Sequence, residues 1–354
     1  MNRVKQIGRH GQQVWLDSLS RQLIESGRLQ QLIDEDGIAG VTSNPAIFEQ
    51  ALAKDPSYRD ALAALAAGDA EQRFEAVALP DIQAACDVLR PVFDASGGAA
   101  GFVSFEVSPR LAHDAEGTFE AARRLWAAID RPNAMIKIPA TAEGLVAIEQ
   151  SIAAGINVNV TLMFSHRHIR DVFEAYALGL TRRAAAGQPI DHVRSVASVF
   201  VSRWDARLDP ILAERAPELV GKVAIASARR GYQFWKTRFG AGSSFAALAA
   251  KGGHPPLLLW ASTGVKNPAY RDTLYVESLI GPDTVDTVPE ATLNAFRDHG
   301  EAAATLENDL EEATAVLDHL ARLDIDLERH ADVLQQEGLA SFSKAFAELM
   351  RLVA

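Results

Sequence analysis

The chain has 354 residues, of which 48% are hydrophobic and 23% are charged, as in an ordinary soluble globular protein. Its formal net charge of −11 argues against a nucleic-acid-binding surface, because phosphate backbones are bound by clustered Lys and Arg. A polar N-terminus and the lack of an apolar run of about 20 residues argue against export and membrane insertion. We therefore expect a cytoplasmic protein with no nucleic-acid or membrane partner.

Short apolar runs alternate along the chain with longer amphipathic stretches. The runs are β-branched or apolar on both faces, as buried parallel strands are. The predicted strands are 14–17, 38–42, 101–106, 133–138, 156–161, 194–201, 256–262 and 273–279. Helical patterns lie between them, for example at 118–129, 142–153 and 166–186. Eight strands alternating with helices predict an α/β fold, a single (β/α)8 TIM barrel.

The spacing of the strands predicts extra helices outside the barrel repeat. Residues 46–94 should hold two or three helices, and 240–253 a loop around a short helix. Residues 302–350 are predicted to form two or three helices that pack against the barrel. Cys86 is the single cysteine; it fits a reducing cytosol and is expected to be a small packing group. With no repeat or low-complexity linker, residues 1–354 are expected to form one domain.

Polar side chains recur where the predicted strands end. Barrel enzymes place their active sites at these carboxyl ends. Polar groups are costly to bury without partners or purpose, so their recurrence predicts a functional cluster. In chain order these residues are Asp17, Thr42 with Asn44, Glu106, Lys137, Thr161, Ser202 with Arg203, and Ser262.

Lys137 is the most informative of these residues. Its neighbours Ile136 and Ile138 are apolar, and burial disfavours a charged ammonium, so the segment favours a neutral amine that can attack a carbonyl. The alternative is a strand-end lysine that reaches solvent or pairs with a carboxylate.

Three other residues at the strand ends, here called the rim of the barrel, have alternative interpretations. Asp17 and Glu106 suit general acid–base chemistry, but Asp17 could cap a helix starting near Leu19, and Glu106 could pair with Arg110. Asn44 followed by proline is a strong helix-start signal, which explains that pair without a ligand.

Metal and nucleotide cofactors are not expected. His166 and His168 lie two apart on a predicted helix and would point to different faces. The glycines at 252–253 lack the lysine and the following helix of a phosphate-binding loop.

Five segments, each at a predicted strand and in the same order, resemble the transaldolase family, and the likeness covers nearly the whole chain. They read WLDSLSR from residue 15, GVTSNP from 40, VSFEV from 103, MIKIPAT followed by Glu143-Gly144 from 135, and GINVNVTLMFS from 155. The ordered set is far more specific than any single segment.

The resemblance implies a role for each site residue. Lys137 resembles the Schiff-base lysine, and Asp17 the group that takes the hydroxyl proton during carbon–carbon cleavage. Glu106, with Thr161 and a bound water, resembles the proton shuttle for imine formation and hydrolysis. The residues expected to bind substrate are Thr42, Asn44, Asn159, Ser198, Phe200, Arg203, Ser262 and Lys266. Among them Arg203 matches a phosphate-binding arginine, and Lys266 takes the place of an arginine that many members carry after the seventh strand.

The implied activity is that of a transaldolase of the pentose phosphate pathway, without a cofactor. A dihydroxyacetone unit would pass from sedoheptulose 7-phosphate or fructose 6-phosphate to glyceraldehyde 3-phosphate or erythrose 4-phosphate. One alternative is a class I aldolase, or fructose 6-phosphate aldolase, that releases free dihydroxyacetone. Another is a non-catalytic barrel that binds sugar phosphates. A monomer and a homodimer are both compatible with the sequence.

Overall fold

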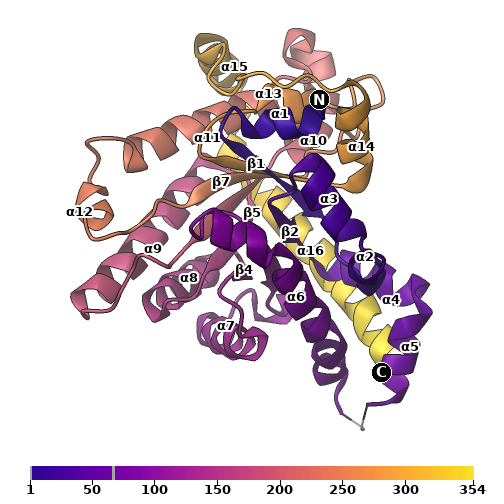
Figure 1. Ribbon diagram of the computed structural model, residues 1–354. Helices are drawn as coiled ribbons and strands as arrows, with labels where there is room; N and C mark the ends of the chain where they lie inside the picture. The colour runs from indigo at the N-terminus through magenta and orange to yellow at the C-terminus, as the bar shows by residue number, and fades with distance from the viewer. Residues whose placement is uncertain (1, 66–67) are drawn as a thin grey trace.

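Eight parallel strands close into a barrel in which each strand pairs with the next along the chain and β8 pairs with β1 (Figure 1). The computed structural model describes residues 2–65 and 68–354. The strands are β1 (Gln12–Asp17), β2 (Gly40–Thr42), β3 (Phe102–Glu106), β4 (Ala134–Pro139), β5 (Val158–Met163), β6 (Ser195–Phe200), β7 (Leu257–Ala261) and β8 (Thr284–Val288). The predicted (β/α)8 barrel is confirmed.

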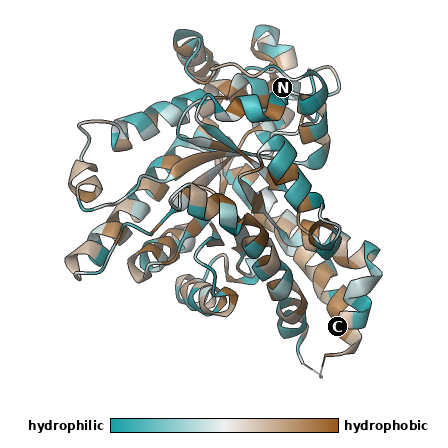
Figure 2. Cartoon of the chain, viewed as in Figure 1, coloured by the Kyte–Doolittle hydropathy of each residue, from teal (hydrophilic) through white to brown (hydrophobic). Residues whose placement is uncertain are grey.

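Helices surround this barrel, and Figure 2 shows mainly hydrophobic strands at the centre with hydrophilic residues on the helices around them. The helices are α1 (Arg3–Gly8), α2 (Arg21–Glu25), α3 (Arg28–Asp36), α4 (Pro45–Lys54), α5 (Pro56–Ala63), α6 (Ala70–Ala95), α7 (Ala115–Ile129), α8 (Ala142–Ala154), α9 (His166–Ala185), α10 (Ser202–Arg215), α11 (Val223–Phe239), α12 (Ala246–Ala249), α13 (Leu274–Ser278), α14 (Glu290–His299), α15 (Leu310–Arg322) and α16 (Leu327–Val353). None of the helices in the described ranges is long and apolar enough to cross a membrane.

The predicted elements outside the barrel repeat are confirmed. The segment 46–94 holds most of α4, all of α5 and most of α6, and 240–253 contains the short helix α12. The C-terminal segment forms α15 and α16, and α16 packs against α4 and α6. Cys86 is a free, fully buried residue of α6, as expected of a packing group.

Seven of the predicted strands agree with the structure to within two residues at each end, but the eighth prediction is wrong. Residues 273–279 contain the helical turn α13, and β8 follows it at Thr284–Val288. Short apolar runs fit a helical turn as well as a strand, and Tyr275, Val276 and Leu279 bury one face of the turn. The strand β8 contains Asp286, and aspartate is depleted in strands, so its sequence is not recognised as a strand.

The barrel interior is apolar below the strand ends. Trp15, Phe102, Met135, Val196, Leu259, Ala261 and Val285 form a buried cluster. The indole of Trp15 on β1 lies over Gly40 of the paired strand β2, where a Cβ would lie 2.5 Å from it. This packed layer separates the carboxyl ends of the strands from a cavity at their amino ends that is lined by Trp15, Phe102 and Arg194.

Candidate active site

A cavity of about 240 Å³ lies at the carboxyl ends of the strands. It is lined by Asp17, Thr42, Asn44, Ala46, Lys137, Thr161, Ser198, Phe200, Arg203, Ala261, Ser262, Gly264, Lys266, Thr287, Pro289, Ser341 and Phe342. The structure thus brings ten of the twelve predicted site residues to one cavity. The other two, Glu106 and Asn159, contact cavity residues directly.

Lys137 lies near the end of β4 and is only 5% exposed. Its Nζ donates a hydrogen bond to the carbonyl oxygen of Ser43 at 3.1 Å and lies 3.6 Å from Oε2 of Glu106. Adjacent strands create this pair, because Glu106 of β3 is in register with Lys137. The lysine therefore faces the cavity with a carboxylate beside it, and does not reach bulk solvent.

Burial raises the pKa of Glu106 to about 7, although the charge of Lys137 acts to lower it. A carboxyl with this pKa gains and loses a proton readily near neutral pH. Glu106 can therefore act as a proton donor or as a proton acceptor beside Lys137. The suggested pairing of Glu106 with Arg110 is wrong, since Arg110 lies 3.6 Å from Glu71 instead.

Asp17 ends β1 and accepts a hydrogen bond from the hydroxyl of Thr42 at 2.7 Å. Burial raises the pKa of Asp17, while the charge of Lys137 and the Thr42 hydrogen bond act to lower it. The alternative role as a helix cap is excluded, because α2 begins at Arg21 and Ser20 caps it by accepting from the Leu23 amide. The carboxyl group is left to face the cavity.

A hydrogen-bonded chain fixes the amide of Asn159. The hydroxyl of Ser198 donates to Oδ1 of Asn159 at 2.7 Å, and Nδ2 of Asn159 donates to Oγ of Ser104 at 2.9 Å. Asn159 is in register with Lys137 on the next strand, so this chain lies beside the lysine. It holds Asn159 and Ser198 in one orientation.

Asn44 combines its structural role with a place at the cavity. Its Oδ1 accepts hydrogen bonds from the amides of Ala46 and Ile47, which confirms the predicted cap of α4. The cap orients the side chain so that its Nδ2, which donates hydrogen bonds, is the group left for a ligand.

Two cations line the outer part of the cavity. Arg203 and Lys266 are exposed, and within residues 2–65 and 68–354 neither has an ion-pair partner. Ser262 lies nearby with a φ of 57°, and its hydroxyl is 3.0 Å from that of Ser202. Phe200 borders the same cavity and packs on Phe164 with ring centroids 5.2 Å apart. The outer cavity thus offers positive charge and hydroxyls suited to an anion.

Two buried oxygen atoms of the site have no hydrogen-bond partner among the described residues: Oγ1 of Thr161 and Oε2 of Glu106. Most buried polar atoms in native proteins are hydrogen-bonded, so an unpaired one needs an explanation such as a catalytic role or a bound water. No cluster of His, Cys, Asp and Glu suited to a metal ion occurs in the described ranges.

Helix α16 contributes to the site, and no sequence pattern predicts this contribution. Ser341 and Phe342 of this helix line the cavity, and the ring centroid of Phe342 is 5.6 Å from Nζ of Lys137. Thr287 is a second unpredicted cavity residue, and its hydroxyl lies 2.7 Å from that of Thr42. No motif or strand-end position marks Phe342, which lies 205 residues after Lys137 along the chain.

Comparison with known proteins gives one consistent result. The model of the transaldolase/fructose-6-phosphate aldolase family matches residues 14–353. The transaldolase of Thiobacillus denitrificans is 49% identical over 356 residues, covering 99% of each chain. That of Neisseria gonorrhoeae is 53% identical over 342 residues, covering 96% of each. Transaldolase 1 of Streptomyces coelicolor is 46% identical over 357 residues, covering 99% of this chain and 93% of the relative.

Proposed function

The chain belongs to the transaldolase/fructose-6-phosphate aldolase family, and from that premise we propose that it is a transaldolase whose rim residues move a dihydroxyacetone unit between sugar phosphates. The observation that carries the proposal is the buried pair of Lys137 and Glu106 at the cavity. We further propose that the enzyme works in the cytoplasm, in agreement with its free, buried Cys86.

In the proposed reaction, the neutral amine of Lys137 adds to the C2 carbonyl of a ketose phosphate. Loss of water from the carbinolamine gives an iminium, which accepts electrons as the C3–C4 bond breaks. Glu106 supplies and removes the protons of these steps, and its pKa of about 7 suits both directions. Thr161, whose hydroxyl has no hydrogen-bond partner within residues 2–65 and 68–354, would hold the water that carries the proton.

Asp17 takes the proton from the C4 hydroxyl during cleavage. The aldose phosphate leaves, and the enamine of dihydroxyacetone stays bound until an acceptor aldehyde arrives. Asn44 and Asn159 hold the hydroxyls of the three-carbon unit, and Arg203 with Lys266 binds the phosphate. The protein groups and the covalent iminium supply the activation at each step.

Borohydride trapping tests this proposal. Reduction in the presence of fructose 6-phosphate should add a stable adduct to the peptide that contains Lys137, detectable by mass spectrometry. Lys137→Arg should fold normally and give neither adduct nor turnover, because arginine is not deprotonated in proteins. An adduct on a different lysine would contradict the assignment.

A further inference from the structure

Helix α16 crosses the carboxyl end of the barrel and contributes a wall of the active site. It contacts β5 along one part and α4 and α6 along another, and Figure 1 shows it running from the barrel toward α4 and α5. Ser341 and Phe342 lie at the cavity between these contacts.

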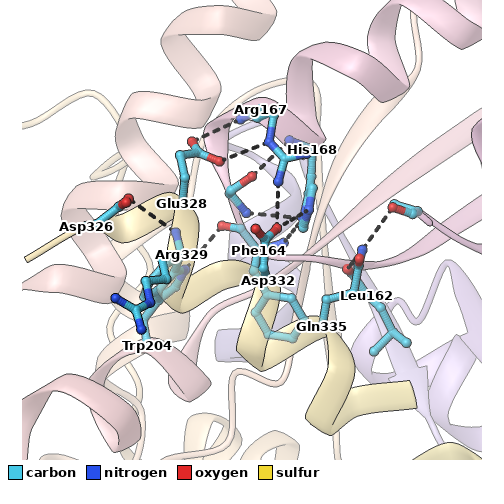
Figure 3. Close-up of polar contacts among 12 residues, drawn as sticks. Leu162, Phe164, Arg167, His168, Trp204, Asp326, Glu328, Arg329, Asp332 and Gln335 are labelled. Carbon is cyan, nitrogen blue, oxygen red and sulfur yellow. Dashed lines mark hydrogen bonds and ion pairs between the residues drawn. The ribbon is translucent and has the colours of Figure 1, made fainter. Parts of the chain in front are cut away.

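The anchor of α16 is Gln335. Its Nε2 donates hydrogen bonds to the carbonyl oxygens of Ala140 at 2.9 Å and Leu162 at 3.1 Å, and Figure 3 shows Gln335 reaching toward the Leu162 backbone. Ala140 follows β4, the strand of Lys137, and Leu162 follows Thr161 directly. The position of the helix is therefore tied to the backbone of the two strands that carry Lys137 and Thr161.

The backbone of Leu162 is shaped for this contact. Leu162 has a φ of 57°, in the left-handed region that non-glycine residues rarely adopt, and the β5–β6 register shifts between Val160 and Met163. Its side chain fills the space beside Gly338, where a Cβ would lie 2.8 Å from Cδ2 of Leu162. Strained residues of this kind cluster where function requires a set geometry.

Ion pairs between α9 and the first turns of α16 also hold the helix against the barrel. Arg167 of α9 lies 3.6 Å from Glu328 and 2.6 Å from Asp332. Figure 3 shows both acidic residues beside Arg167. These groups are about half exposed, so each pair stabilises the docked helix only weakly. The Gln335 bonds and the apolar packing are the stronger restraints.

Phe342 lies seven residues beyond Gln335, two helical turns along the same face. Its ring centroid is 5.6 Å from Nζ of Lys137, within the distance at which an aromatic face attracts a cation. The ring is thus an apolar cover over the nitrogen where the iminium and the enamine would form.

We propose that Phe342, positioned by Gln335, limits the access of water to the covalent intermediate and so favours transfer of the three-carbon unit over its release. This inference rests on the proposed transaldolase function. Release begins when the enamine gains a proton at the carbon that lost the aldehyde. Water then adds to C2 of the iminium and the C2–N bond breaks, giving dihydroxyacetone and the Lys137 amine. Glu106 can supply the proton, so water is the reactant that must be limited.

The test is the ratio of release to transfer, measured with the full chain. Release is measured as the free dihydroxyacetone formed from fructose 6-phosphate without an acceptor. Transfer is measured with fructose 6-phosphate as the donor and erythrose 4-phosphate as the acceptor aldehyde. Phe342→Ala should raise the ratio by about tenfold or more, because the site loses its apolar cover. Phe342→Leu, which keeps an apolar side chain there, should stay closer to the parent protein.

The matched control is Met350→Ala on the same helix. Met350 is buried in the core and lines neither this cavity nor the pocket beside Glu106. This variant should lose stability while its ratio of release to transfer stays near the parent value. An equal rise in both alanine variants would show that a loosened helix, and not the ring of Phe342, is responsible.

Gln335→Ala tests the positioning role, with Gln336→Ala as its control because Gln336 is the exposed neighbour. The first should raise release relative to transfer and the second should not. Borohydride trapping distinguishes failure of the shielding proposal from failure of the proposed transaldolase function. Trapping on Lys137 with an unchanged ratio in Phe342→Ala and Gln335→Ala would overturn the shielding role alone, whereas no trapping in the parent protein would overturn the proposed function.

Discussion

The two carboxyl groups at the rim, Asp17 and Glu106, are both buried but differ in their partners. Asp17 accepts a hydrogen bond from Thr42, which stabilises its charged form. Oε2 of Glu106 has no hydrogen-bond partner in the part of the chain that the structure describes, and the charge of Lys137, at 3.6 Å, balances that of the carboxylate. The first environment suits a base that acts once on a substrate hydroxyl, and the second suits a group that gains and loses protons repeatedly.

Asp17→Asn removes the proposed base for carbon–carbon cleavage and leaves Lys137 in place. Turnover should fall by about 10²–10⁴-fold, the usual contribution of a general base. Imine formation should continue, so borohydride should still trap fructose 6-phosphate on the variant. The control is Asp34→Asn, an exposed aspartate of α3. Near-normal transfer by Asp17→Asn would remove Asp17 from the reaction.

Lys266→Ala tests the proposed phosphate site. Loss of a charge-assisted contact costs about 1.5–3 kcal/mol, so KM for phosphorylated sugars should rise about tenfold or more. An unphosphorylated acceptor such as glyceraldehyde should scarcely be affected. Lys251→Ala, an exposed lysine of the loop before β7, should change neither value. Equal losses on both acceptors would indicate structural damage instead of a lost phosphate contact.

At the scale of elements, strand positions follow well from local pattern. Buried parallel strands are short apolar runs between turn residues, and seven of them could be located that way. The eighth could not, because the short apolar run that contains α13 fits a strand as well as a helical turn, and Asp286 interrupts the β-branched residues of β8. The rim residues followed from the strand ends, but Phe342 did not. Its place beside Lys137 depends on how α16 docks, and docking between distant segments leaves no local pattern.

Gly40→Ala tests the close packing of β2 on the barrel interior. A Cβ at this position would lie 2.5 Å from the rigid indole of Trp15, so the backbone or the ring must shift. Overpacking of this kind costs about 1–3 kcal/mol, which denaturant unfolding should register as a lower midpoint. Gly8→Ala on α1 is the control, because a Cβ there meets nothing within 4 Å. A stability unchanged by Gly40→Ala would mean that the interior adapts freely.

At the scale of the whole molecule, we propose that residues 1–354 fold as one cooperative unit. The last helix, α16, contacts α4, α6 and β5, so the end of the chain is part of the barrel's surroundings. Phe346 of α16 and Phe74 of α6 belong to the same buried core as the strands. Separation of α16 from the barrel would expose that core, so thermal unfolding should proceed in one transition.

That transition should depend on pH through Asp286, a fully buried residue of β8 outside the cavity. Burial raises its pKa from 3.8 to about 7, although the hydrogen bond from Thr263 acts to lower it. The folded protein keeps this proton up to about pH 7, whereas the unfolded chain releases it near the ordinary value. The contribution of Asp286 to stability is therefore fully present below about pH 4 and is lost as the pH rises through 7.

Asp286→Asn removes the ionisable group and should leave the melting temperature near the parent value at pH 4. At pH 8 the variant should be the more stable protein, by on the order of 1–3 kcal/mol, because the parent must bury a charge there. Asp318→Asn, an exposed aspartate of α15, should show no such divergence. Melting curves of the three proteins from pH 4 to pH 8 measure this difference. A gap between Asp286→Asn and the parent that stays constant across the range would show that Asp286 keeps its ordinary titration in the folded barrel.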